Sequence, residues 1–205
     1  MDDSRQLLIK GIEYLRVDVS PAQIDLLLAF VSLIQKWNKA YNLTAIRDRD
    51  EMLRLHILDS LAILPYVTGQ KIIDVGTGAG LPGIPLAILM PEVQFTLLDS
   101  NSKKTRFVQQ VVLELKLNNV EVVHSRVEKL ERAGEYDAVL SRAFASVDGI
   151  MNLTEHLLQA EGVLIAMKGQ SPEAELKNIQ RSYTVNSIVL PGVEAERCVL
   201  RINKI

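Results

Sequence analysis

The first third of the chain carries apolar residues at helical spacing. Five of them recur every three or four positions, at Ile24, Leu27, Leu28, Val31 and Ile34. That interval places them on one face of a helix. Just before them, Ser20 and Gln23 are spaced as a capping box, with Pro21 at the first helical position. The pattern therefore predicts an amphipathic helix that begins after Ser20 and ends near Asn38.

Shorter helical patterns flank this helix. One covers residues 4–15, and another covers residues 50–64, where Pro65 is expected to end it. We expect residues 1–65 to form a helical cap that packs on a main domain formed by residues 66–205.

From Lys71 the pattern changes to short β-rich runs that alternate with helical segments. Strands are predicted over residues 71–75, 93–98, 120–124, 136–141 and 162–167, and helices between them over residues 82–89, 102–117, 147–158 and 173–181. This alternation is typical of βαβ units and a parallel sheet. The last two predicted strands, 184–190 and 197–203, are joined by a loop too short for a crossover helix, so they form an antiparallel hairpin. The expected fold is therefore α/β, of the Rossmann-like class I methyltransferase type. It has a seven-stranded, mostly parallel sheet, an antiparallel terminal hairpin and an N-terminal helical cap.

Composition and charge narrow the class of protein further. Apolar residues make up 48% of the 205 residues and charged residues 23%, as in ordinary globular chains. No apolar run approaches the roughly 18 residues that cross a bilayer, and no leader-like pattern begins the chain. Cys198 is the single cysteine, so no internal disulfide is expected. We therefore expect a cytoplasmic protein without membrane contact. Because the formal net charge is −2, any RNA binding must rest on local basic patches.

The most informative segment joins the strand at residues 71–75 to the next helix. It reads Gly76-Thr77-Gly78-Ala79-Gly80-Leu81-Pro82. A dinucleotide-binding loop needs its third glycine at position 81, where this chain has Leu81, so the loop argues against NAD or FAD. Glycines let the backbone approach a ligand closely, and the helix start beyond them offers unpaired N–H groups. An adenosyl group with an amino-acid tail suits that surface.

Acidic residues lie at positions where such a ligand needs hydrogen-bond acceptors. Asp99 ends the second strand, 23 residues after Gly76, at an offset suited to the two ribose hydroxyls. Asp74 precedes the glycines and either orients the ligand's ammonium group or only caps a helix or turn. Glu128 follows the third strand. It either accepts from the adenine amine, beside the Val127 N–H, or belongs to a solvated helix start.

The fourth strand ends at residues 141–144, where enzymes of this architecture present residues to the methyl acceptor. The N/D-P-P-Y/F pattern of enzymes that methylate exocyclic amines is absent there. Cys198 lies far along the chain, which disfavours a cysteine nucleophile. His56, His124 and His156 show no metal-ligand spacing. We therefore expect no metal and interpret the three histidines as structural or surface residues.

Several segments fit together as parts of one familiar pattern. They are residues 36–44 (KWNKAYNLT), 56–60 (HILDS), 74–83 (DVGTGAGLPG), 141–145 (SRAFA) and 168–170 (KGQ). These segments span nearly the whole chain and closely resemble the bacterial GidB family, the small-subunit ribosomal RNA guanine-N7 methyltransferases. The resemblance implies transfer of a methyl group from S-adenosylmethionine to N7 of one guanosine in the decoding-region loop of 16S rRNA. S-adenosylhomocysteine is the implied product.

The resemblance also implies which residues form the site. The implied cofactor contacts are Gly76, Leu81, Val127, Glu128 and Arg142, supported by Gly78, Gly80 and Asp99. Arg142 is also expected to position the acceptor base. We expect RNA to contact basic residues around the glycine loop, namely Arg126, Lys168, Lys103, Lys104 and Arg106. The substrate is then 16S rRNA, either alone or within the small subunit or an assembly intermediate, and the enzyme acts as a monomer.

Two other functions stay open. A methyltransferase of the same fold that acts on a small molecule or a protein would bind the same cofactor but would not need the basic residues. A non-catalytic regulator that senses nucleotides would bind adenosine compounds and transfer no methyl group. The choice of acceptor separates the first of these from an RNA enzyme, and the transfer itself separates the second.

Overall fold

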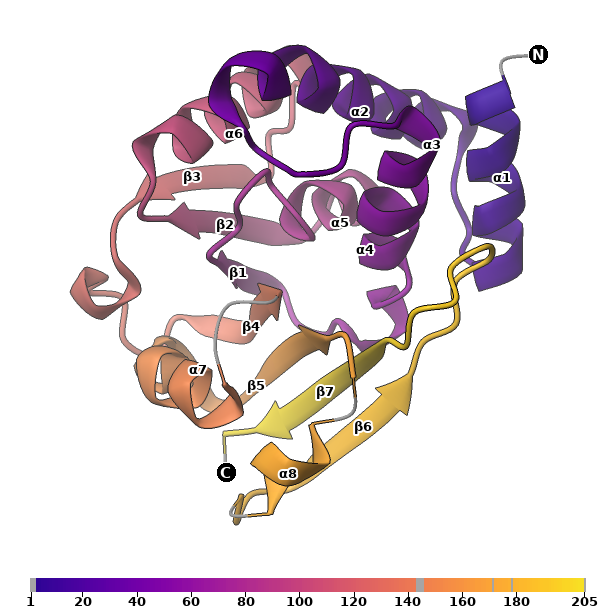
Figure 1. Ribbon diagram of the computed structural model, residues 1–205. Helices are drawn as coiled ribbons and strands as arrows, with labels where there is room; N and C mark the ends of the chain where they lie inside the picture. Colours follow the sequence, from indigo (N-terminus) through magenta and orange to yellow (C-terminus); the bar gives the residue numbers. More distant parts are fainter. Residues whose placement is uncertain (1–2, 143–145, 171, 178, 205) are drawn as a thin grey trace.

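The computed structural model describes residues 3–142, 146–170, 172–177 and 179–204. Their strands form one seven-stranded sheet with helices on both faces (Figure 1). The strand order is β3-β2-β1-β4-β5-β7-β6, in which β1 to β5 run parallel and β7 is antiparallel to both of its neighbours. The expected α/β class, with a mostly parallel sheet and an antiparallel terminal hairpin, is confirmed.

Most strand boundaries follow the hydrophobic pattern. The strands are β1 (Lys71–Val75), β2 (Gln94–Asp99), β3 (Val120–His124), β4 (Tyr136–Arg142), β5 (Leu158–Lys168), β6 (Tyr183–Ser187) and β7 (Cys198–Asn203). The first and third match their predicted ranges to the residue. β5 begins four residues before its predicted start, because Leu158 pairs with Tyr136 ahead of a register irregularity.

The helices of this alternating part are shorter than predicted. They are α5 (Gly83–Leu89), α6 (Ser102–Leu115), α7 (Val147–Thr154) and α8 (Glu173–Leu176). α7 gives way to a 3-10 turn before β5 begins. The predicted helix over residues 173–181 is wrong beyond Leu176, where the Ile179 N–H closes a turn onto the Leu176 carbonyl.

The N-terminal third is helical, as the pattern predicts. Its helices are α1 (Asp3–Leu15), α2 (Pro21–Tyr41), α3 (Arg49–Met52) and α4 (Asp59–Leu61), with a π-helical segment, Leu53–Leu58, between the last two. The capping box is confirmed: the Ser20 side chain accepts from the Gln23 N–H, and the Gln23 side chain accepts from the Ser20 N–H. Pro65 does not simply end a helix, because it lies inside a 3-10 turn, Leu64–Tyr66.

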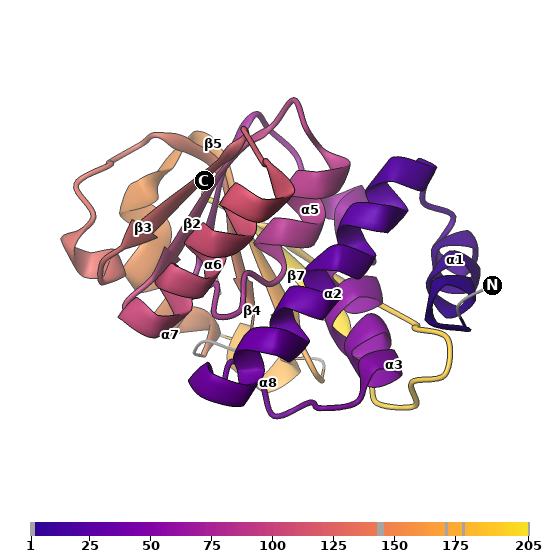
Figure 2. The same cartoon turned by 90° about the horizontal axis from the view of Figure 1, so that it is seen from above.

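Both faces of the sheet are buried. Successive residues of a strand point to opposite faces, so Ile72 of β1 packs with α2, α5 and α6, while Ile73 packs with α7 and α8. Figure 2 shows α2 lying across α5 and α6, with α1 and α3 beyond it. The N-terminal helices and one face of the sheet therefore share a continuous apolar core.

The chain between β6 and β7 reaches back to the N-terminal helices (Figure 1). Pro191 and Gly192, at the tip of this connection, line a small cavity together with Leu7 of α1 and Arg54 of the π-helical segment. β6 accordingly ends at Ser187 rather than at the predicted residue 190. The terminal hairpin thus brings the last strand next to the first helices.

Candidate active site

A cavity of about 620 Å³ opens where the carboxyl ends of four parallel strands meet. Its lining includes Gly76 after β1, Asp99 at the end of β2, Arg126 after β3 and Arg142 at the end of β4. β1 and β4 are adjacent, and the connections from them leave in opposite directions along the sheet. Open α/β sheets bind ligands at such a switch point. We call this space the first cavity.

The glycine loop forms one wall of the first cavity. Gly76 and Gly78 have φ of 72° and 61°, a region that other residues adopt only with strain. The loop is fixed to β2, because the Gly78 N–H donates to Asp99 Oδ2 at 2.9 Å and the Gly76 N–H donates to the Leu98 carbonyl at 2.8 Å. A side chain at Gly80 would be both strained and crowded, because φ is +82° and its Cβ would lie 2.7 Å from Ile84 Cγ1. The backbone conformation at position 80 therefore requires glycine.

The two predicted acidic residues occupy different places. Asp99 lines the first cavity, and its second oxygen accepts from the Asn101 N–H at 2.8 Å. Asp74 does not line it. The Asp74 Oδ2 atom instead accepts from the Thr77 hydroxyl at 2.7 Å and the Gly83 N–H at 3.0 Å, so Asp74 ties the loop to the start of α5. Of the two roles left open for Asp74, the structure favours the cap.

Burial raises the pKa of Asp74 to about 7, although the hydrogen bonds from Thr77 and Gly83 act in the opposite direction. In the unfolded chain the group has its ordinary pKa of 3.8. The folded state therefore holds this proton more tightly than the unfolded state does. The stability that Asp74 contributes is fully present below about pH 4 and is lost as the pH rises through 7.

Asp74→Asn is expected to gain thermal stability relative to the parent as the pH rises from 5 to 8. The amide stays neutral, and its oxygen can still accept from Thr77 and Gly83. The difference in Tm between the variant and the parent should grow by roughly 5–10 °C over this range. Scanning calorimetry of both proteins at the two pH values measures it. A constant difference would mean that Asp74 is ionised in the fold throughout.

The segment after β3 supplies the opposite wall of the first cavity. Val127 is buried, while Glu128 and Arg126 are exposed, and all three line the cavity. Val127 and Glu128 belong to a short 3-10 helix, Val127–Lys129, which Arg126 precedes, so both roles of Glu128 stay open. Among the basic residues on α6, Lys104 lines the cavity, whereas Lys103 and Arg106 are exposed and do not.

Gly78, Gly80 and Leu81 are not among the residues that line the first cavity. Leu81 is buried in the apolar core and precedes a cis peptide bond to Pro82. Their implied part in cofactor binding stays a prediction. Residues 143–145, which the sequence places next to the methyl acceptor, lie outside the described residues.

A second cavity, of about 340 Å³, adjoins the first. Among the described residues, Arg142 alone lines both. The lining of the second cavity includes His56 and Asp59 from the N-terminal helices, Lys168 at the end of β5, and Arg197 with Cys198 at the start of β7. The structure thus separates Lys168 from the other basic residues. Lys168 forms an ion pair with Glu175 at 3.3 Å.

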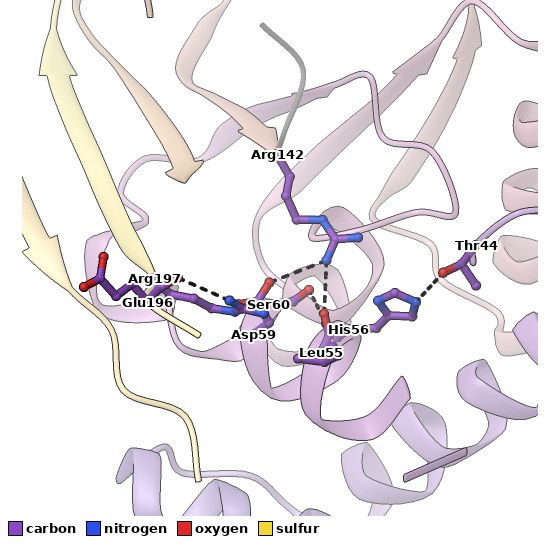
Figure 3. A network of polar contacts seen from close by, with 8 residues as sticks. All are labelled: Thr44, Leu55, His56, Asp59, Ser60, Arg142, Glu196 and Arg197. Carbon is purple, nitrogen blue, oxygen red and sulfur yellow. Dashed lines mark hydrogen bonds and ion pairs between the residues drawn. The ribbon is translucent and has the colours of Figure 1, made fainter. Parts of the chain in front are cut away.

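Charged side chains in the second cavity are connected through Asp59 (Figure 3). Arg197 Nε lies 2.9 Å from Asp59 Oδ1, and Arg142 Nη1 lies 3.6 Å from Asp59 Oδ2. Arg142 Nη1 also donates to the Leu55 carbonyl at 3.4 Å. Burial raises the pKa of Asp59, and the two arginines act in the opposite direction.

The sequence patterns did not indicate this second cavity. They assigned no role to Asp59 or Arg197, and His56 was expected to be a structural or surface residue. The segment at residues 56–60 carried the family resemblance without an assigned role for His56 or Asp59, and of the cavity lining only Arg142 and Lys168 had been given roles. His56 is in fact buried at the cavity wall.

Two further observations concern the described part of the chain. No three His, Cys, Asp or Glu side chains within it gather as metal ligands. None of its helices combines the length and the apolar character needed to span a membrane.

Sequence comparison finds close similarity to one family. The family model described as rRNA small subunit methyltransferase G, GidB, matches residues 23–198. A protein of that name from Legionella pneumophila is 49% identical over 199 residues, which cover 97% of this chain and 94% of the relative. One from Hydrogenovibrio crunogenus is 55% identical over 181 residues, which cover 87% and 84%.

Structure comparison finds similarity in fold. A SAM-dependent methyltransferase from Aquifex aeolicus superposes with a TM-score of 0.58 at 17% identity, over 76% of this chain and 93% of that one. Geranyl diphosphate methyltransferase in complex with SAM superposes with a TM-score of 0.55 at 8% identity, over 71% and 84%. At such low identity the match establishes the fold alone, which is that of the class I methyltransferases.

Proposed function

The chain belongs to the rRNA small subunit methyltransferase G family, and from this premise we propose that it methylates N7 of one guanosine, at position 527 in the decoding-region loop of 16S rRNA. The methyl donor is S-adenosylmethionine. The observation that carries the proposal is the pair of cavities that meet at Arg142, one suited to the cofactor and the other open to an acceptor.

The first cavity fits S-adenosylmethionine in size and chemistry. Its volume of about 620 Å³ lies within the range of roughly 300–1,000 Å³ found for small-molecule sites. Asp99 offers a carboxylate for the ribose hydroxyls, and Gly76 lets the backbone approach the amino-acid tail. Glu128 and Val127 stand where the adenine is expected. The bound cofactor would supply an electrophilic methyl group on a sulfonium centre.

Methylation of guanine N7 requires little acid–base chemistry from the protein. Guanine N7 already carries an unprotonated lone pair. The chain therefore needs to orient the base, exclude water and stabilise the charge that moves to the purine, and it needs no general base. Arg142 is well situated for orientation because it borders both cavities.

We further propose that residues 1–65 serve as a cap over residues 66–205. Ile46, Leu55, His56 and Asp59 line one side of the second cavity, and residues from the ends of β4, β5 and β7 line the other. An acceptor in that cavity would therefore contact both parts. Basic residues at the rims, Lys103, Lys104, Arg106, Arg126 and Lys168, would then meet RNA phosphates.

The decisive experiment uses labelled S-adenosylmethionine and an acceptor that lacks the modification. Free 16S rRNA and intact small subunits from a strain without this enzyme are incubated separately with the protein, and the labelled nucleotide is mapped. One labelled guanosine carrying the methyl group on N7 supports the proposal. Label on a protein or a small molecule would support an enzyme of the same fold with another substrate. Cofactor binding without transfer to any acceptor would support a regulator.

Asp99→Ala is expected to weaken S-adenosylmethionine binding by about 1–3 kcal/mol. The ribose hydroxyls lose a charged acceptor, and the Gly78 N–H loses its partner in the loop. Titration calorimetry gives the affinity. Asp99→Asn keeps an acceptor for Gly78, so it separates the two effects and should lose less. An affinity of Asp99→Ala within twofold of the parent would remove Asp99 from the cofactor site.

A further inference from the structure

The His56 ring carries a buried nitrogen with no hydrogen-bond partner in the described part of the chain. The side chain is 4% exposed, and Nδ1 has no hydrogen-bond partner among the described residues. Nε2 lies 2.9 Å from the Thr44 hydroxyl (Figure 3). That hydroxyl accepts from the Ile46 N–H at 3.2 Å and still has a proton that it can donate to Nε2. A neutral ring whose Nε2 accepts carries its proton on Nδ1.

The His56 ring is neutral at physiological pH. Burial and then the positive charge of Arg142 lower its pKa to about 4, and the Leu55 carbonyl opposes this shift. In the tautomer in which Nε2 accepts from Thr44, Nδ1–H is a donor in the wall of the second cavity without an acceptor at good hydrogen-bond geometry among the described residues. Buried donors in folded proteins are nearly always paired. The missing acceptor is then expected to come from a ligand or from ordered water.

The same cavity also holds an acceptor, Asp59. Asp59 follows His56 by three residues, lines the second cavity and is 7% exposed. Each of its oxygens faces one arginine, Arg197 at 2.9 Å and Arg142 at 3.6 Å. A carboxylate oxygen accepts more than one hydrogen bond. Asp59 can therefore accept from a ligand as well.

A donor beside an acceptor matches guanine and not adenine. Guanine presents its 6-oxo acceptor next to the N1–H donor, whereas adenine presents a 6-amino donor next to an N1 acceptor. The second cavity has room for one purine, and it adjoins the first cavity at Arg142. We propose that the target guanine enters the second cavity, where His56 Nδ1–H donates to its 6-oxo group and Asp59 accepts from its N1–H. This assignment rests on the proposed function.

The Arg142 guanidinium lies beside the His56 ring in the second cavity (Figure 3). Its contacts with described residues are long, 3.4 Å to the Leu55 carbonyl and 3.6 Å to Asp59. Side chains at binding sites commonly change rotamer when a ligand arrives. A change in the Arg142 rotamer would open Nδ1 to the base while Arg142 stays at the junction of the two cavities.

The test measures which purine the enzyme accepts at the target nucleotide. RNA carrying guanine, inosine or 2,6-diaminopurine there is methylated under kcat/KM conditions. All three bases have N7, inosine keeps the 6-oxo group and N1–H, and 2,6-diaminopurine has lost both. The parent should accept inosine within a few-fold of guanine and discriminate against 2,6-diaminopurine by about 10- to 100-fold or more.

His56→Phe and Asp59→Asn should each reduce the guanine to 2,6-diaminopurine ratio by about tenfold or more. His56→Asn, which keeps a donor near the position of Nδ1, should retain most of it. The ratio does not depend on how much of a variant is folded. If His56→Phe has no measurable activity, the ratios of the other two variants decide the matter.

Matched controls are available near the amino ends of β4 and β5, away from both cavities. His156 is exposed, Asp137 accepts from the Gln70 and Lys71 N–H groups, and neither lines the two cavities. His156→Phe and Asp137→Asn should leave the ratio unchanged. An unchanged ratio in the His56 and Asp59 variants would overturn the assignment. A parent enzyme that places no methyl on guanine N7 would instead overturn the proposed function.

Discussion

Arg142→Ala is expected to lower the single-turnover rate of methyl transfer by about 10²- to 10³-fold at saturating cofactor. Arg142 alone, within the part of the chain that the structure describes, lines both cavities, so its loss should free the acceptor to move relative to the methyl donor. A misplacement of about 1 Å is enough for a rate loss of this order. Rapid-quench measurement with labelled cofactor gives the rate directly.

The same substitution removes one of the two arginines that face Asp59. The Arg142 side chain is a quarter exposed and its distance to Asp59 is 3.6 Å, so the loss of stability should be about 1–2 kcal/mol. Fully buried pairs lose about 3–5 kcal/mol when one partner is removed. The rate effect should therefore exceed what unfolding explains at 25 °C, and Arg142→Lys, which keeps the charge but not the fork of donors, should recover only part of it.

Arg132→Ala is the matched control for Arg142. Arg132 also pairs with a carboxylate, Glu121 at 2.6 Å, and lines neither cavity. Its removal should leave the transfer rate within about twofold, as expected for a partly exposed ion pair remote from the site. Normal turnover by folded Arg142→Ala, accompanied by a large fall in Tm, would make Arg142 a structural residue only.

Substrate RNA with 7-deazaguanine at the target nucleotide is expected to accept no methyl group. This analogue replaces N7 with a C–H group and so removes the nucleophile, while the 6-oxo group and N1–H remain. Transfer should fall below detection, a loss of more than about 10⁴-fold if the lone pair is indispensable. The analogue should still compete with normal RNA, because its Watson–Crick edge and phosphates are unchanged.

The experiment with 7-deazaguanine RNA measures binding and methyl transfer separately. Inhibition by the 7-deazaguanine RNA, measured against normal RNA at fixed cofactor, reports binding. Incorporation of label into the analogue reports the acceptor atom. Methylation of the analogue at the same nucleotide would show that another atom receives the methyl group. Loss of both inhibition and transfer would show that N7 contributes to recognition as well as to chemistry.

Much of this protein follows from local sequence. The capping box at Ser20 and Gln23 forms as its spacing predicts, because both partners lie within one helical turn. β1 and β3 begin and end where their apolar runs do. The glycine loop is also locally determined, since positive φ at Gly76 and Gly78 is a property of single residues.

The ends of several strands and helices depend on tertiary contacts that the local sequence pattern does not contain. β5 extends back to Leu158 because Tyr136 of β4 pairs with it. β6 stops at Ser187, and the chain beyond it turns towards the N-terminal helices. The predicted helix over residues 50–64 is divided by a π-helical segment, Leu53–Leu58, which no sequence pattern indicated.

The first cavity could be anticipated from sequence because parallel strands bring their carboxyl ends to one edge of a sheet. The motifs at the carboxyl ends of β1 to β4 therefore lie together at that edge. The second cavity follows no such rule. His56 and Asp59 come from the N-terminal helical segment, Arg142 from later in the chain and Arg197 from near its end. Only the packing of the N-terminal helices against the terminal hairpin brings these charges together, and burial then lowers the pKa of His56 and raises that of Asp59. The sequence by itself determined the glycine loop, whereas the tertiary structure decided the lining of the second cavity.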